Sequence, residues 1–127
     1  MTKTIIAPAA VTVPNVPLSP GVGFGDLVFV SGQLPIVQGT GELAEGIEAQ
    51  TRACLDNLKT VLEAGGASLD SVLKTTVFLK DMNDFGAMNE IYAKAFPDNP
   101  PARSAFQVAR LPKDAMVEIE AVAARVK

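Results

Sequence analysis

Few side chains in this chain suit chemistry, and Arg103 is the best supported of them. Arg103 follows two consecutive prolines, Pro100 and Pro101, after one intervening residue, and it is expected at the first residue of a strand. Because prolines stiffen the backbone, this guanidinium stands on a firm support and suits bidentate capture of a carboxylate. An arginine at a strand start is also common as a plain surface charge, so the residue type alone leaves both roles open.

The carboxylates Glu118 and Glu120 are the candidates for proton transfer. They alternate with Val117, Ile119 and Ala121 and therefore share one face of a predicted strand. Carboxylates beside an apolar interface tend to have altered pKa values and can act as acids or bases, but they form salt bridges just as commonly. On the residues alone, the catalytic and the structural interpretation are equally supported.

The chain of 127 residues has no histidine and a single cysteine. A Ser-His-Asp or Cys-His nucleophile system and a histidine-ligated zinc are therefore excluded. Cys54 occupies the apolar face of a predicted helix, where a thiol is usually a small buried hydrophobe with a raised pKa and not a nucleophile. Acid–base chemistry is left to carboxylates, lysines, Tyr92, backbone groups and water.

Charge and cysteine content also bear on partners and location. The formal net charge is −3, so the basic excess that drives binding to phosphate backbones is lacking, and we expect no nucleic-acid partner. One cysteine cannot form an internal disulfide, and no stretch has the length and apolar character of a signal segment or a membrane span. We expect one cytoplasmic domain over residues 1–127.

Two segments look like ligand-binding motifs only superficially. Residues 21–25 read Gly-Val-Gly-Phe-Gly, but they precede a strand, whereas a dinucleotide loop follows a strand and opens a helix. A bend entering a strand is predicted there instead. Residues 81–84 read Asp-Met-Asn-Asp, but Phe85 stands where a calcium loop needs an oxygen ligand. Helix capping by Asp81 or Asn83 is the prediction at this place.

The elements that must position these residues are two helices and a set of strands. Apolar residues recur with helical spacing over residues 47–64, where Gly65-Gly66 supplies the stop. A second helix follows the capping segment and ends before Pro97. Strands are predicted at residues 3–7, 27–30, 72–80, 103–109 and 116–125, and residues 38–42 are typical of a turn that closes a hairpin, which accounts for a third strand before the first helix. The element order is β-β-β-α-β-α-β-β, which indicates an α+β sheet with two helices on one face.

The second face of this sheet carries a prediction about assembly. The strands at residues 27–30 and 72–79 are apolar on both faces. Two helices cover only one face, and a bare second face would expose a larger apolar patch than soluble monomers normally show. We therefore expect a homo-oligomer in which copies of the chain cover that face.

Several segments together resemble one known family. They are Ser31-Gly32-Gln33-Leu34-Pro35, Gln50 to Asn57, Val72 to Phe85, Pro101-Ala102-Arg103-Ser104, Val108-Ala109-Arg110-Leu111-Pro112 and Glu118-Ile119-Glu120-Ala121. In these segments the chain resembles the reactive-intermediate deaminases, the Rid or YjgF-like family. The resemblance covers nearly the whole chain and is most specific in its Pro-Ala-Arg-Ser and Ile-Glu-Ala segments.

The resemblance implies a fold and an activity. The implied fold is chorismate-mutase-like, a mixed sheet with two helices on one face, assembled as a homotrimer with clefts between subunits. The implied activity is the hydrolysis of reactive 2-imino and enamine acids, such as 2-aminoacrylate and 2-iminobutanoate, to 2-keto acids and ammonia. It implies a small-molecule partner, and no metal, cofactor or membrane.

The resemblance also assigns residues to a site. It implies that Arg103 binds the substrate carboxylate, that Glu118 handles the attacking water, and that Asn89 lines the cleft together with backbone groups near Gly32 and Ala105. Two positions depart from the pattern. Leu18 stands where many members have a tyrosine that reaches the substrate, which bears on substrate preference, and Ala105 replaces a cysteine whose backbone alone is expected to be used.

One distance limits this arrangement. If the strands on either side of the turn at residues 112–113 paired directly, Glu118 would lie opposite Gln107, roughly 13 Å along the strand from Arg103 at about 3.3 Å per residue. The two groups then meet either through a bulge or from neighbouring subunits.

Two other functions are compatible with the same sequence. A non-catalytic trimer that binds small carboxylates or stabilises other proteins agrees with the missing tyrosine. An RNA-cleaving role has also been associated with such proteins, but the negative charge and the lack of histidine oppose it.

Overall fold

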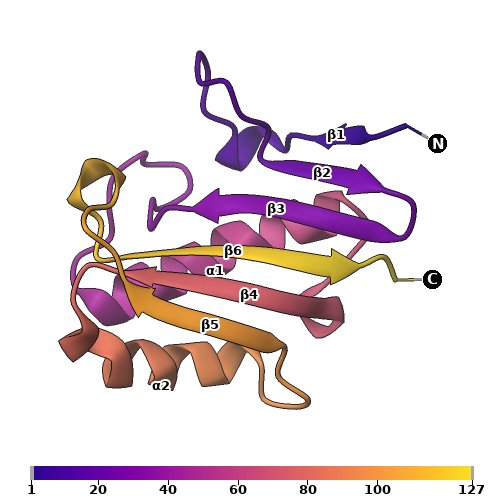
Figure 1. The fold of residues 1–127 in the computed structure, drawn as a ribbon. Helices are drawn as coiled ribbons and strands as arrows, with labels where there is room; N and C mark the ends of the chain where they lie inside the picture. Colours follow the sequence, from indigo (N-terminus) through magenta and orange to yellow (C-terminus); the bar gives the residue numbers. More distant parts are fainter. Residues whose placement is uncertain (1, 127) are drawn as a thin grey trace.

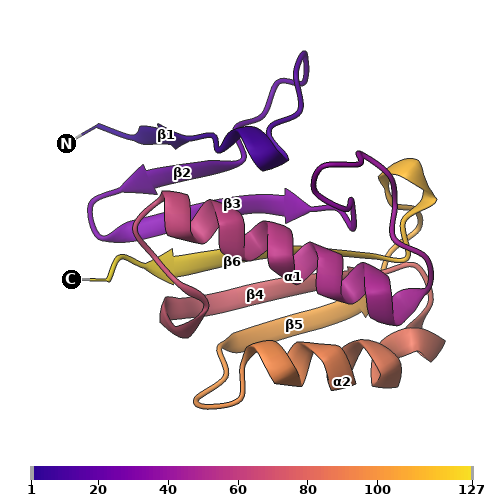
Figure 2. The ribbon, with the colours of Figure 1, turned by 180° about the vertical axis from the view of Figure 1, so that it is seen from behind.

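A mixed six-stranded sheet carries both helices on one of its faces (Figures 1 and 2). The computed structural model describes residues 2–126. The strands lie in the order β1-β2-β3-β6-β4-β5, with β4 and β5 parallel and the other neighbours antiparallel. The elements are β1 (Thr4–Ile6), β2 (Gly21–Phe24), β3 (Leu27–Gln33), α1 (Ile47–Ala64), β4 (Val72–Leu79), α2 (Phe85–Ala95), β5 (Ala102–Gln107) and β6 (Val117–Ala124). The predicted α+β fold is confirmed, and the order of strands and helices agrees with the prediction, although one of the three strands before α1, β2, lies at residues that were predicted as a bend.

The helices begin and end close to the predicted residues. Helix α1 spans the predicted range, and Gly65 caps its C-terminus through backbone bonds, followed by Gly66 at a φ of 84°. At the other helix, the Asp81 carboxylate accepts a hydrogen bond from the Asn83 backbone nitrogen at 2.8 Å. Asp81 therefore caps the short 3-10 turn that precedes α2, whereas α2 itself starts at Phe85 without a side-chain cap.

Residues 21–24 of the glycine-rich segment form strand β2 instead of the predicted bend, and only Gly25 lies in a turn that enters the next strand. A Cβ at Gly21 would come within 2.7 Å of the Val61 side chain of α1. The glycine thus allows close packing of this strand against the helix. The turn into β3 is at Gly25, which has a φ of 59°.

The turn predicted at residues 38–42 is confirmed, with the Val37 nitrogen donating to the Glu42 oxygen at 2.8 Å and the Ala44 nitrogen donating to the Pro35 oxygen at 3.0 Å, but the hairpin has no extended strand ladder. The turn joins only one isolated bridge, between Ile36 and Leu43. The reason lies in α1: the buried Asn57 amide donates to the backbone oxygens of Leu34 at 3.1 Å and Ile36 at 2.8 Å. These carbonyls are satisfied by a helix side chain instead of a strand partner.

Strands β5 and β6 do not pair with each other, which corrects the predicted register. Strand β4 lies between them, so Glu118 pairs with Phe78, and Phe78 pairs with Phe106 of β5. The parallel β4–α2–β5 crossover places β5 at the edge of the sheet, and the chain then returns to insert β6 on the other side of β4. Glu118 is therefore two strands away from β5 and is not opposite Gln107.

The core lies between the sheet and the helices. Alternate residues of β3 and β6, such as Val28, Val30, Val117 and Ile119, pack there against α1 and α2. The intervening side chains point away from the helices, and Phe29 of β3 is 43 % exposed. None of the helices formed by residues 2–126 is long and apolar enough to cross a membrane.

Candidate active site

Arg103 lies on β5 and reaches back onto helix α2. It pairs with Thr75 of β4, and its Nη1 donates to the Asn89 Oδ1 at 2.7 Å. The structure therefore brings together two of the residues that the resemblance assigned to the substrate site. A hollow of about 380 Å³ opens beside them, lined by Asn89, Tyr92, Ala93, Phe96, Pro100, Pro101 and Arg103.

Glu118 and Gly32 are the second pair that the structure brings together. The Glu118 carboxylate lies so close to the Gly32 Cα that a Cβ at residue 32 would overlap its Oε2. Glu118 is half-buried, and burial raises the pKa of its carboxyl, with a further contribution from the charge of Glu120. A carboxyl with a raised pKa exchanges protons more readily near neutral pH than an ordinary glutamate.

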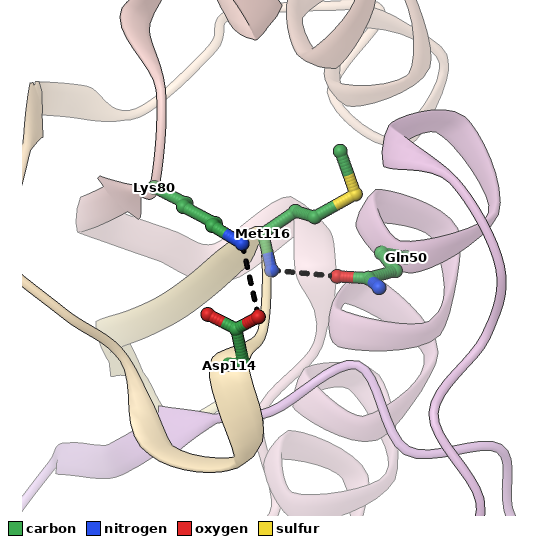
Figure 3. A network of polar contacts seen from close by, with 4 residues as sticks. All are labelled: Gln50, Lys80, Asp114 and Met116. Atoms are coloured by element: carbon green, nitrogen blue, oxygen red, sulfur yellow. Dashed lines mark hydrogen bonds and ion pairs between the residues drawn. The ribbon is translucent and has the colours of Figure 1, made fainter.

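The entry to β6 is held in place just before Glu118 (Figure 3). The Met116 backbone nitrogen donates to the Gln50 Oε1 at 2.8 Å, and the Lys80 backbone nitrogen donates to the Met116 oxygen at 2.9 Å. The Lys80 side chain also pairs with Asp114 at 3.0 Å. Glu118 thus follows a segment that is hydrogen-bonded on both sides, which fixes its place on the strand.

The Arg103–Asn89 pair and the Glu118–Gly32 pair lie on opposite faces of the sheet. The hydroxyl of Thr75, the register partner of Arg103, hydrogen-bonds to Tyr92 of α2. The side chains of Thr75 and Arg103 therefore point to the face of the sheet that the helices cover. Glu118 pairs with Phe78, three residues further along β4, and residues three apart on a strand point to opposite faces. Arg103 and Glu118 of one chain are also separated by about 10 Å along the strands and about 10 Å across them.

The remaining predicted site residues are Ala105 and Leu18. Ala105 pairs with Val77, and its side chain packs against the core, so only its backbone is available to a ligand. Leu18 lies in the loop that leads to β2, on the side of the sheet remote from β5, and is 53 % exposed. The next residue, Ser19, accepts a hydrogen bond from the Ser31 Oγ at 2.6 Å, so this loop lies beside the end of β3 that carries Gly32.

Cys54 is fully buried and donates weakly to the Val117 oxygen at 3.5 Å. Burial raises the pKa of its thiol, with a smaller contribution from the charge of Glu118, which agrees with a packing role. Among residues 2–126 no group of three or more His, Cys, Asp or Glu side chains could hold a metal ion. Another hollow, of about 590 Å³ between α1 and the segment at residues 36–44, is lined by neither Arg103 nor Glu118.

Phe85 and Tyr92 of α2 contact Arg103, and these contacts were not predicted from the sequence. The Arg103 Cζ lies 5.4 Å from the Phe85 ring centroid and 4.8 Å from that of Tyr92. Their spacing with Asn89, at i, i+4 and i+7, puts all three on one helix face. That spacing was the signal available in the sequence.

The fold and the site together define a small α+β protein with an arginine held by an amide and two aromatic rings and a half-buried carboxylate on the other face of its sheet. A family model described as "Endoribonuclease L-PSP" matches residues 8–125. The chain belongs to this family, which is the YjgF-like family that the sequence resembles.

Individual relatives cover nearly the same length. The chain is 52 % identical over 111 residues to a RutC family protein of Pyrococcus horikoshii, covering 87 % of this chain and 88 % of that protein. It is 46 % identical to a protein of Salmonella typhimurium named 2-iminobutanoate/2-iminopropanoate deaminase, covering 98 % of this chain and 99 % of that protein. The crystal structure of Escherichia coli TdcF with bound serine superposes with a TM-score of 0.92 at 41 % identity, covering 97 % of this chain and 99 % of TdcF.

Proposed function

We propose that this protein is a 2-iminobutanoate/2-iminopropanoate deaminase, a hydrolase that converts 2-imino and enamine acids to 2-keto acids and ammonia. The observation that carries the proposal is the Arg103 guanidinium, which the Asn89 amide oxygen fixes at 2.7 Å and with which no carboxylate of residues 2–126 forms an ion pair. Its charge is therefore available to a substrate carboxylate. The relatives named deaminase over nearly the whole chain support the same activity.

In this proposal Arg103 binds the substrate carboxylate as a planar fork. Asn89 fixes one Nη of that fork, so the imine carbon is held at a defined distance from the cleft walls. Backbone groups near Gly32 and Ala105 line the pocket, and Leu18 contacts the substrate from a neighbouring chain. Orientation of this kind contributes much of the rate in reactions that already proceed in water.

Glu118 handles the water and the proton. The water oxygen attacks the carbon of the protonated imine while Glu118 takes one water proton, which gives a neutral tetrahedral carbinolamine. Glu118 then returns this proton to the nitrogen, and the C–N bond breaks with its electron pair leaving on ammonia. The hydroxyl proton passes to the departing ammonia, so that the products are the 2-keto acid and an ammonium ion. The raised pKa of Glu118 suits a group that must both accept and release a proton.

The proposal requires the site to be completed between chains. Arg103 and Glu118 face opposite sides of one sheet, and the face of Glu118 also carries exposed apolar residues such as Phe29 and Phe106. We propose a homotrimer in which copies of the chain cover this face and bring Arg103 of one subunit to Glu118 of the next. The cytoplasmic location expected from the sequence stays a prediction.

The experiment generates 2-iminobutanoate from 2-aminobutyrate with an amino-acid oxidase in the presence of semicarbazide. An active deaminase diverts the imine to 2-ketobutyrate before semicarbazide traps it. We expect the protein to accelerate this conversion, Arg103→Ala to abolish the acceleration, and Arg110→Ala, on the exposed segment after β5, to leave it intact. No acceleration by the wild-type protein would reject the proposal.

The two alternative functions, binding without turnover and RNA cleavage, predict different experimental results. A trimer that only binds small carboxylates would bind 2-ketobutyrate without turnover, and Leu18 in place of a tyrosine is the feature that favours it. RNA cleavage, as in the description of the family model, would require RNA binding with a steep salt dependence. The net charge of −3 argues against that outcome.

A further inference from the structure

Three side chains of α2 surround the guanidinium of Arg103. Phe85, Asn89 and Tyr92 lie at i, i+4 and i+7 and so share one face of the helix. The Arg103 Cζ is 5.4 Å from the Phe85 ring centroid and 4.8 Å from the Tyr92 centroid, and its Nη1 bonds to Asn89. Two ring faces and one amide oxygen are a suitable environment for a planar cation.

All three contacts are neutral. Among residues 2–126, no carboxylate oxygen lies within 4.0 Å of the Arg103 guanidinium nitrogens. A salt bridge would fix the arginine but would also satisfy its charge. Ring faces and an amide oxygen fix it while leaving the positive charge for an incoming anion.

The Tyr92 ring is itself held in place by the strand next to β5. Its hydroxyl bonds to the Thr75 hydroxyl at 2.6 Å, and its ring lies 4.7 Å from that of Phe96. Thr75 is the register partner of Arg103 and is fully buried. The backbone pairing and the side-chain contacts therefore form a closed loop from Arg103 through Thr75 and Tyr92 back to the guanidinium.

We propose that Phe85, Asn89 and Tyr92 form a guanidinium-binding site on α2 that exists independently of the covalent attachment of Arg103. In the intact protein the site is occupied by Arg103, and Phe85 and Tyr92 act as positioning residues for it. When the arginine side chain is removed, the site binds a free alkylguanidinium ion. The catalytic consequence rests on the proposed deaminase function, whereas the binding itself does not.

The test uses the full-length Arg103→Ala protein and ethylguanidinium, which supplies the two missing methylene groups and the guanidinium. Binding is measured by NMR as saturable shifts of the α2 amide signals. Ethylammonium is the matched control because it has the same charge and alkyl chain without the planar fork. We expect saturable binding of ethylguanidinium, no matching response to ethylammonium, and recovery of imine hydrolysis as the site fills.

Additional variants test the assignment of the rings. In the Arg103→Ala background, Phe85→Leu should weaken ethylguanidinium binding by about tenfold, because one cation–π face is lost. Lys94→Ala, an exposed change on the same helix, should leave binding unaltered. In the protein that retains Arg103, Phe85→Leu should raise KM more than it lowers kcat.

The outcomes separate this inference from the proposed function. If ethylguanidinium binds to the Arg103→Ala protein, but neither the loaded variant nor the wild-type protein hydrolyses imines, the guanidinium site is supported and the deaminase proposal fails. If folded Arg103→Ala protein shows no saturable binding, or binds equally well after Phe85→Leu, the guanidinium site is rejected whatever the activity.

Discussion

The Arg103 guanidinium and the Glu118 carboxylate lie on opposite faces of one sheet, two strands apart. Arg103 pairs in register with Thr75, whose hydroxyl hydrogen-bonds to Tyr92 of α2, so both side chains point to the helices. Glu118 pairs in register with Phe78, and both side chains point to the other face. A four-carbon substrate cannot reach both groups within one chain. Any reaction that uses both therefore needs residues from more than one copy of the chain, and this relationship underlies the predictions below.

Gly32→Ala should disable the site without unfolding the protein. A Cβ at this position would occupy the space of the Glu118 carboxylate, so the carboxylate must move. Displacement of a catalytic group by about 1 Å costs roughly 100-fold in rate. We expect a loss of that order in kcat/KM for 2-iminobutanoate, measured by the semicarbazide competition assay.

Gly86→Ala is the matched control for this substitution. Nothing lies within 4 Å of a Cβ built at Gly86, which is in the first turn of α2. Alanine is the better helix former, so the control should keep its activity and gain about 0.5–1 kcal/mol in stability. Equal activity of Gly32→Ala and the wild-type protein would contradict the assigned closeness of Gly32 and Glu118.

The pH dependence of catalysis should report Glu118. Burial and the Glu120 charge raise the pKa of its carboxyl, and the base must be deprotonated to accept a proton from water. The acidic limb of kcat/KM should therefore lie above the range of an ordinary glutamate. Glu120→Gln removes one cause of the raised pKa and should move that limb to lower pH; an unmoved limb would assign it to another group.

The same raised pKa has a consequence for stability. Because the folded-state pKa of Glu118 lies above the unfolded-state value, the folded protein binds the proton more tightly. The stability that this tighter proton binding at Glu118 adds is fully present below the unfolded-state pKa and is lost as pH rises through the folded-state pKa. In urea unfolding across this window, Glu118→Gln should lose less stability on raising the pH than the wild-type protein does.

The apolar open face predicts the state of assembly. Leu27, Phe29 and Phe106 on this face are 38 %, 43 % and 45 % exposed in the single chain. Sedimentation at micromolar concentration should give the mass of three 13.3-kDa chains. Phe29→Lys should dissociate the assembly, whereas Glu63→Lys, exposed on α1, should not; a single-chain mass for the wild-type protein would refute the oligomer.

Arg125 should be the main stabiliser of the N-terminal strand. Its guanidinium donates to the Gly65 oxygen at 3.1 Å, the Gly25 oxygen at 2.7 Å and the Thr4 hydroxyl at 3.3 Å. It thereby joins β1, the β2–β3 turn and the C-terminus of α1, where a positive charge is favourable. Arg125→Ala should lower the free energy of unfolding by about 2 kcal/mol; an unchanged urea midpoint would show that these bonds contribute nothing net.

Periodicity predicted the helices and most strands because burial on one face imposes a pattern on the sequence. The bounds of α1 agree with the prediction, and the alternation of Glu118 and Glu120 with Val117 and Ile119 is as expected. Strand order was not predictable in the same way. The turn at residues 112–114 joins β5 and β6 in sequence, yet the parallel crossover through α2 places β4 between them.

In the candidate site, the residues themselves could be predicted from the sequence, but their side-chain partners could not. The type and context of Arg103 and Glu118 drew attention to both, but side-chain partners depend on packing that a linear pattern does not encode. Phe85 and Tyr92 look like any apolar pair on a helix until β5 places Arg103 on their rings. Gln50 likewise looks like a surface residue until the segment before β6 brings the Met116 nitrogen to it.

Subunit complementation tests the central claim most directly, namely that one imine-hydrolysing site combines Arg103 of one chain with Glu118 of its neighbour. Arg103→Ala and Glu118→Gln are each expected to be inactive. After unfolding and joint refolding in equal amounts, random assembly should restore about a quarter of wild-type activity, because that fraction of interfaces carries both intact groups. A mixture that stays as inactive as its components, although mixed assemblies have formed, would contradict the account.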